Sequence, residues 1–173
     1  MTTEPCTRPP QVVTSDAFSA IFRHHPAGVA VVALRDGDRP VGFTATSVVS
    51  VSADPALLTF SVAGTSSTWP ALSRSRSLTI SFLGAEQADV SARFATSGVD
   101  RFAGVAWRWL PTGEPVLDGV VSWVRGDVVD RVPVGASHLV VVHVRETSQP
   151  QRPGAPLVYH DRAYHALDER SAL

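Results

Sequence analysis

From Val29 onward the chain is a succession of short runs rich in β-branched and aromatic residues, each ended by turn-forming residues. The runs read GVAVVAL, PVGF, ALLTFSV, SLTISFL, VAWRWL, VVSWVRGDVVD and HLVVVHV, and the breaks include DGD, ADP, PTGEP and VPVG. Such runs are typical of strands and such breaks of turns. Helices do not alternate with the strands, as they would in a doubly wound sheet. The pattern therefore predicts a closed or nearly closed antiparallel β-barrel.

Helical periodicity is confined to a few short segments. They cover residues 14–25, 67–75 and 85–98. Thr14 or Ser15 can cap the first helix, and Gly98 can end the last. We expect these helices to flank the strands.

The length and composition favour one domain. A chain of 173 residues, 44% of them hydrophobic, can bury one sizeable core. We expect a flexible N-terminal tail over residues 1–13, a single domain over 14–168 and a C-terminal tail over 169–173. The formal net charge of -1 gives no basic surface of the kind that binds nucleic acid.

Cysteine usage and hydropathy predict a cytoplasmic protein. Cys6 is the only cysteine, so an intramolecular disulfide framework is excluded and a reducing compartment fits. The chain shows neither a signal-peptide pattern nor an apolar run long enough to span a bilayer. No metal site is predicted, because the histidines lack the spacing of a shared site.

Motifs that mark a self-sufficient active site are missing. The sequence has no G-x-G-x-x-G, P-loop, H-E-x-x-H or G-x-S-x-G pattern. Chemistry supplied by a bound cofactor is therefore favoured. Two hydroxyl-rich stretches are candidates for holding one, GFTATSVVSVSADP at 42–55 and AGTSSTWPAL at 63–72.

The second stretch leads from four hydroxyl residues into a predicted helix with Pro70 in its first turn. Free N–H groups and hydroxyls at a helix start can bind a phosphate group. The alternative is that Ser67 or Thr68 only caps the helix.

These two stretches together resemble the FMN-binding split-barrel family of flavin reductases, the small partners of two-component flavin-dependent monooxygenases. The motifs GFTATS, ALLTFSVAG and TSSTWPAL carry the resemblance, which extends over about residues 16–167. It implies a mostly β fold, a single-domain antiparallel split β-barrel of Greek-key type with a few short flanking helices.

The resemblance also implies a set of site residues. The residues expected along the flavin ring edge and ribityl chain are Thr44, Ala45, Thr46 and Ser47. Those expected to present backbone groups to the isoalloxazine are Ser61, Val62 and Ala63. Those expected at the phosphate are Ser66, Ser67 and Thr68, with Arg101 and Phe102 near the mouth of the site. For Thr44 and Ser47 the alternative is hydrogen bonding between strand and turn.

One position departs from the family pattern. Members commonly read Gly-Asp-His before the penultimate strand, with the histidine near the nicotinamide, whereas this chain reads Gly135-Ala136-Ser137-His138. His138 occupies the position of the family's histidine and is the expected catalytic residue. Ser137 occupies the position of the acidic residue, which would orient the imidazole in the family. The tryptophans are expected in the core or at a subunit interface.

The function implied is an NAD(P)H-dependent flavin reductase that transfers a hydride from NADH or NADPH to FMN or FAD. The family also implies a homodimer with flavin sites near the subunit boundary, and a partner monooxygenase that receives the reduced flavin. Two alternatives stay open: a flavin-binding protein without reductase activity, and a barrel that binds another small apolar ligand. The residues do not choose between FMN and FAD, or between NADH and NADPH.

Overall fold

The computed structural model describes residues 12–148 and 154–172. The predicted tail over residues 1–13 lies almost wholly outside the described residues, as does Cys6. No helix in the described part of the chain is long and apolar enough to cross a membrane.

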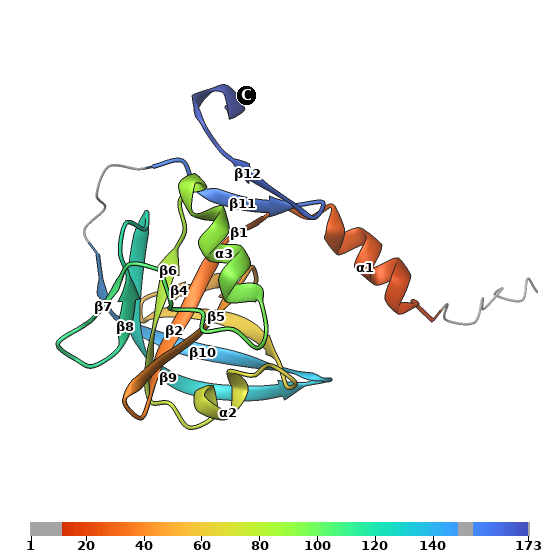
Figure 1. The fold of residues 1–173 in the computed structure, drawn as a ribbon. Coiled ribbons are helices and arrows are strands. Elements are labelled where there is room, and N and C mark those ends of the chain that lie inside the picture. Colours follow the sequence, from red (N-terminus) through yellow and green to blue (C-terminus); the bar gives the residue numbers. More distant parts are fainter. Residues whose placement is uncertain (1–11, 149–153, 173) are drawn as a thin grey trace, which may run out of the picture.

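Short strands dominate the chain, with a few brief helices between them (Figure 1). The strands are β1 (Ala27–Gly28), β2 (Ala30–Asp36), β3 (Arg39–Ala45), β4 (Val49–Ala53), β5 (Ala56–Ala63), β6 (Ser77–Phe82), β7 (Trp107–Trp109), β8 (Pro115–Leu117), β9 (Ser122–Val134), β10 (Ser137–Thr147), β11 (Leu157–His160) and β12 (Ala163–Ala166). The helices are α1 (Ser15–Arg23), α2 (Trp69–Leu72) and α3 (Ala88–Ala95), with 3₁₀ turns η1 (Ala85–Gln87) and η2 (Glu169–Ser171).

The body of the molecule is one antiparallel seven-stranded sheet. Its strand order is β3-β2-β6-β9-β10-β5-β4, and smaller sheets are formed by β1-β11-β12 and β7-β8. The predicted mostly β, antiparallel fold is confirmed. The prediction of full closure is wrong. Within the described residues, edge strands β3 and β4 do not pair with each other, because β4 pairs with β5 instead. The sheet therefore stays open beside the end of β3.

Strand β2 separates two hydrophobic clusters. Ala30, Val32 and Leu34 face a cluster that contains Phe60 and Ile80. Val31 and Ala33 face the other cluster, which includes Phe94 of α3. All five of these β2 residues are at most 1% exposed. Burial on both faces explains why this strand is a continuous apolar run in the sequence rather than an alternating one.

The helices partly follow the sequence prediction. Thr14 caps α1 as expected, since its Oγ1 accepts a hydrogen bond from the N–H of Ala17 at 3.2 Å. Helix α2 is only four residues long, and α3 starts through η1 and ends at Ala95. The predicted end at Gly98 is wrong, because Thr96 already has extended backbone; Gly98, at φ +77°, belongs to the following loop.

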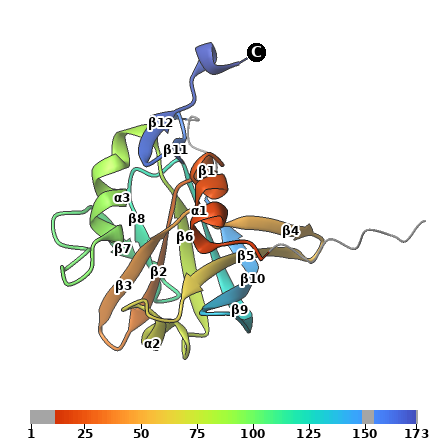
Figure 2. The ribbon, with the colours of Figure 1, turned by 90° about the vertical axis from the view of Figure 1, so that its right-hand side faces the viewer.

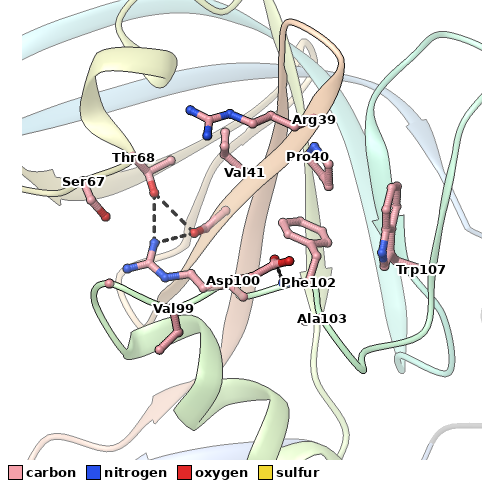
Figure 3. A pocket seen from close by; sticks show the side chains of 13 residues that line it. Arg39, Pro40, Val41, Ser67, Thr68, Val99, Asp100, Phe102, Ala103 and Trp107 are labelled. Carbon is pink, nitrogen blue, oxygen red and sulfur yellow. Dashed lines mark hydrogen bonds between the residues drawn. The ribbon is translucent and has the colours of Figure 1, made fainter.

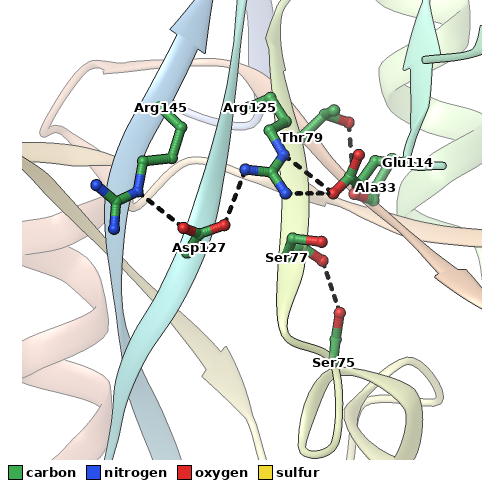
Figure 4. Close-up of polar contacts among 8 residues, drawn as sticks. All are labelled: Ala33, Ser75, Ser77, Thr79, Glu114, Arg125, Asp127 and Arg145. Atoms are coloured by element: carbon green, nitrogen blue, oxygen red, sulfur yellow. Dashed lines mark hydrogen bonds and ion pairs between the residues drawn. The ribbon is translucent and has the colours of Figure 1, made fainter. Parts of the chain in front are cut away.

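A chain of ion pairs links β9 and β10 with the residue before β8 (Figure 4). The guanidinium of Arg125 on β9 lies 2.9 Å from Glu114 Oε1 and 2.8 Å from Asp127 Oδ1, and Arg145 on β10 donates to Asp127 at 2.8 Å. Glu114 is only 2% exposed. Burial acts to raise the pKa of Glu114, but hydrogen bonds from neighbouring side chains, Arg125 among them, outweigh it and lower the pKa.

Candidate functional site

A pocket of about 470 Å³ lies where the sheet is left open. Its walls come from the end of β3, the end of β5, the loop before α2 and the residues after α3. The lining residues are Phe43, Thr44, Ala45, Thr46, Ser47, Ser61, Val62, Ala63, Thr65, Ser66, Ser67, Phe94, Ala95, Ser97 and Arg101. We call it the β3–β5 pocket. Most residues singled out in the sequence meet here, although they come from segments far apart in the chain.

Two of the predicted hydroxyls already have protein partners. Thr44 Oγ1 donates to the carbonyl of Ser91 on α3 at 2.7 Å. Ser47 Oγ accepts from the N–H of Ser61 at 3.0 Å and lies 3.2 Å from the Ser61 carbonyl, to which it donates. The Ser47 bonds join a turn to strand β5, as the alternative for this residue describes, whereas the Thr44 bond joins strand β3 to helix α3. They fix the two walls of the pocket at a set spacing.

Other hydroxyls in the pocket have no such partner. Thr46, Thr65 and Ser67 are exposed, and within the described residues their hydroxyl groups make no hydrogen bond to protein. Ser66 Oγ accepts from the N–H of Thr68 at 3.3 Å. The pocket therefore offers several uncommitted donors and acceptors, as a polyhydroxylated or phosphorylated ligand requires.

Arg101 is the one charged residue among the described residues that line this pocket. Its Nη1 donates to the Gly42 carbonyl at 2.7 Å and to Thr68 Oγ1 at 3.1 Å, and its Nε donates to the Thr96 carbonyl at 2.9 Å. Burial lowers the pKa of Arg101, but an arginine remains charged at neutral pH. The guanidinium is thus held from one side by β3, α2 and the loop after α3, and Nη2 makes no hydrogen bond to the described residues.

Thr68 and Phe102 lie outside the β3–β5 pocket. Thr68 is 3% exposed, and its hydroxyl donates to the Gly42 carbonyl at 3.2 Å, so this side chain supports Arg101 (Figure 3). Phe102 is 6% exposed and packs edge to face on Phe94 at 4.9 Å. Both residues line a second, larger hollow on the other side of Arg101.

His138 lines neither of these pockets. It pairs with Val62 across β5 and β10, and its ring stacks on Trp69 with centroids 3.7 Å apart and an interplanar angle of 19°. Its Nδ1 is buried and has no hydrogen-bond partner among the described residues. A Cβ at Gly64 would lie 3.6 Å from the imidazole, so the ring sits directly beside the backbone that follows Ala63.

The sequence prediction missed some lining residues. Thr65 belongs to the hydroxyl run that was identified but had been given no site role. Ala95 ends α3 and Ser97 follows it, and no motif marks them, because only the packing of α3 against β3 brings them to the pocket. Among the described residues, no group of three or more His, Cys, Asp or Glu side chains could hold a metal ion.

An open antiparallel sheet with a hydroxyl-lined pocket and one anchored arginine has the chemistry that a small phosphorylated ligand requires. The comparison with protein families makes this specific. The family model described as "Flavin reductase like domain" matches residues 22–168. The chain belongs to this family.

Individual relatives agree with the family. An "NADH:FMN oxidoreductase" of Rhodococcus erythropolis is 46% identical over 154 residues, which cover 86% of this chain and 79% of that protein. The "Flavin-dependent monooxygenase, reductase subunit HsaB" of Mycobacterium tuberculosis is 29% identical, covering 87% and 81%. The crystal structure of a flavin reductase domain protein from Arthrobacter sp. FB24 superposes with a TM-score of 0.85 at 37% identity, covering 90% of this chain and 96% of that one.

Proposed function

We propose that this chain is an NAD(P)H-dependent flavin reductase that binds FMN or FAD in the β3–β5 pocket. The observation that carries the proposal is the convergence of residues 44–47, 61–63 and 65–67 with Arg101 on one pocket, in a chain that belongs to the flavin reductase-like family. The relatives named as reductases of flavin or as reductase subunits support the same activity.

The residues of the pocket fit a flavin nucleotide. Ser67 and Arg101 line one part of the pocket, and both have donor groups that no described residue uses. They are suited to the phosphate, because hydrogen bonds between a guanidinium and a phosphate are short and strong. The small side chains of Ala45 and Ala63 would let a planar ring approach the backbone at the ends of β3 and β5. The hydroxyl of Thr46 would be available to the ribityl chain.

The chain's own part in the reaction is binding and alignment. When bound, the flavin supplies the hydride chemistry, accepting a hydride at N5 from the nicotinamide. Thr44 and Ser47, through their bonds to Ser91 and Ser61, would hold the pocket walls rigid, so that two nucleotides meet in a fixed geometry. Fixing both reactants in one site replaces an encounter in solution by a reaction within a complex.

His138 is proposed to act on the nicotinamide side. The support is its position one strand away from the Ser61–Ala63 wall and the buried, unpartnered Nδ1. The stack on Trp69 would fix the plane of the imidazole. Ser137 stands in place of the family's acidic residue, so Trp69 would take over part of the orienting role.

We also propose that the protein is a homodimer with flavin sites near the subunit boundary. Helix α1 stands away from the body of the molecule in Figure 1 and is seen from its outer side in Figure 2, and none of its residues is buried. Phe18, Ile21 and Phe22 on its apolar face are 56–67% exposed. Apolar residues exposed together on one helix face are typical of an interaction surface. Light scattering that finds only monomer at micromolar concentration would contradict the dimer.

Reduced flavin would pass to a partner monooxygenase, as the name of the mycobacterial relative suggests. A cytoplasmic location is proposed on the basis of the single cysteine, which fits a reducing compartment.

The decisive experiment is to add FMN or FAD to the purified protein and to follow both flavin binding and oxidation of NADH and NADPH. We expect binding of at least one flavin and nicotinamide oxidation that depends on it. Flavin binding without oxidation would indicate a flavin carrier, and neither result would indicate a barrel for another ligand. Titration with both flavins and both nicotinamides then establishes the substrate preference.

A further inference from the structure

A second pocket, larger than the first, is lined by residues of β3, by Ser67 and Thr68 and by the loop that contains Asp100 and Phe102 (Figure 3). It has a volume of about 790 Å³ and lies between the start of β3, the residues before α2 and the loop at 98–103. We call it the 98–103 pocket. It shares two lining residues, Ser67 and Arg101, with the β3–β5 pocket. A ligand whose phosphate lies at these two residues can therefore extend into both pockets.

One side of the 98–103 pocket is cationic. Arg101 contributes its anchored guanidinium, and Arg39 on β3 contributes a second one, 76% exposed and held by Asp36 at 3.4 Å. Ser67 and Thr68 stand on the same side of the pocket in Figure 3. Two guanidinium groups, with the exposed hydroxyl of Ser67 lining the same pocket, suit a diphosphate, whose negative charge is divided between two phosphate groups.

The other side of the pocket is aromatic. Phe102 and Trp107 line it, and their rings meet edge to face with centroids 5.3 Å apart. Trp107 is half-buried and lies on the side of the pocket opposite Ser67 in Figure 3. An aromatic ring that keeps part of its surface accessible can stack on a nucleobase.

Asp100 supplies the third feature. Its Oδ1 accepts the N–H of Phe102 at 3.1 Å, and its side chain lies between the two sides of the pocket in Figure 3. A carboxylate repels phosphate, but it accepts hydrogen bonds from ribose hydroxyls in nucleotide sites. Across the pocket the side chains therefore change from cationic through acidic to aromatic. This matches the order of diphosphate, ribose and base in an adenosine diphosphate group.

We propose that the 98–103 pocket binds an adenosine diphosphate group belonging to a dinucleotide whose other half lies in the β3–β5 pocket. The inference rests on the proposed flavin reductase function. Two dinucleotides of the reaction carry this group, FAD and the nicotinamide donor, and both present the same chemistry to Arg39, Asp100 and Trp107.

Two variants test the pocket, each with a matched control outside it. Arg39→Ser removes the exposed cation, and Arg74→Ser removes another arginine that pairs with the same Asp36. Trp107→Leu removes the stacking ring, and Trp109→Leu removes a tryptophan on the same strand that does not line the pocket. Thermal melting establishes that each variant is folded. If Trp107→Leu does not fold, the comparison of Arg39→Ser with Arg74→Ser still tests the proposal.

The flavin arm compares dissociation constants for FAD and FMN without nicotinamide. The nicotinamide arm compares the KM for NADH and for reduced nicotinamide mononucleotide, with FMN as the flavin. If FAD is the ligand, Arg39→Ser and Trp107→Leu weaken FAD binding by roughly tenfold and leave FMN binding unchanged. If the nicotinamide donor is the ligand, the same variants raise the KM for NADH by a similar factor and leave that of the mononucleotide unchanged.

Unchanged FAD affinity together with unchanged KM for NADH in both variants overturns the proposal. So does an equal loss for the mononucleotides, which would show a general disturbance of the site. Failure of the flavin reductase function looks different, because the unmodified protein would then bind no flavin or oxidise no nicotinamide.

Discussion

Replacing Ser67 by alanine isolates the proposed phosphate contact. Ser67 is exposed, and its hydroxyl makes no hydrogen bond to the described residues, so the folded protein loses no internal contact. Exposed substitutions of this kind change the free energy of unfolding by less than about 0.5 kcal/mol. A hydrogen bond to a charged group contributes about 1.5–3 kcal/mol, and the exposure of Ser67 favours the lower end. A loss of about 1.5 kcal/mol raises the dissociation constant for FMN roughly tenfold.

The assay is a titration of the native and Ser67→Ala proteins with FMN and with riboflavin, which lacks the phosphate. We expect weaker binding of FMN and unchanged binding of riboflavin. Equal losses for the two flavins would place Ser67 at the ring or ribityl chain, and an unchanged dissociation constant for FMN would refute the phosphate contact.

Thr68→Val is the matched control from the adjacent position. Thr68 is 3% exposed, and its hydroxyl donates to Gly42 and accepts from Arg101. Its removal should lower the free energy of unfolding by about 1–2 kcal/mol, because the Gly42 carbonyl and Arg101 Nη1 each lose one of their two hydrogen-bond partners. Chemical denaturation separates this stability effect from the binding effect expected of Ser67→Ala.

Three further predictions concern stability and catalysis. Glu114→Gln should lower the free energy of unfolding by about 3 kcal/mol at pH 7, because it breaks a buried pair with Arg125. The folded-state pKa of Glu114 lies below its unfolded value of about 4.3, so the difference in stability between the two proteins should disappear as the pH falls from about 4.3 through the folded pKa. Denaturation at several pH values measures this difference. Gly126→Ala should destabilise by about 1–3 kcal/mol in the same assay, because its Cβ would lie 2.7 Å from the carbonyl oxygen of His143, and an unchanged midpoint would contradict this. His138→Ala should raise the KM for NAD(P)H or slow flavin reduction in stopped-flow experiments with flavin affinity retained, whereas a purely structural role would lower only the melting temperature.

The stacking of Trp69 on His138 allows the proposed role of His138 to be tested a second time. Trp69→Leu removes the support of His138 without touching the β3–β5 pocket, and Trp69→Phe keeps an aromatic face. If Trp69 orients the imidazole, leucine should reproduce the kinetic defect of His138→Ala and phenylalanine should restore much of the native rate. Equal rates in both variants and in the native protein would leave the stack a packing feature only.

The sequence was sufficient to determine the strand content and the hydroxyl-rich segments that line the β3–β5 pocket. Strand runs depend on local β-branched composition and on turn residues, which are visible in a linear chain. The hydroxyl clusters around Thr46 and Ser67 are likewise local, so their motifs could be matched to a family before any contact was known. The family comparison confirmed that match over residues 22–168.

Only the tertiary structure decided what each hydroxyl does. Thr44 and Ser67 look alike in the sequence, yet Thr44 bonds to Ser91, 47 residues away, and the Ser67 hydroxyl makes no hydrogen bond to the described residues. Likewise, the pairing of β4 with β5 leaves the sheet open, and the same opening forms the pocket. Hydrogen-bond partners and strand order are long-range properties, since they depend on which distant segments pack together. Local propensity carries no information about them, and for that reason the sequence did not show that Arg39 and Trp107 line one pocket together with Arg101 and Phe102.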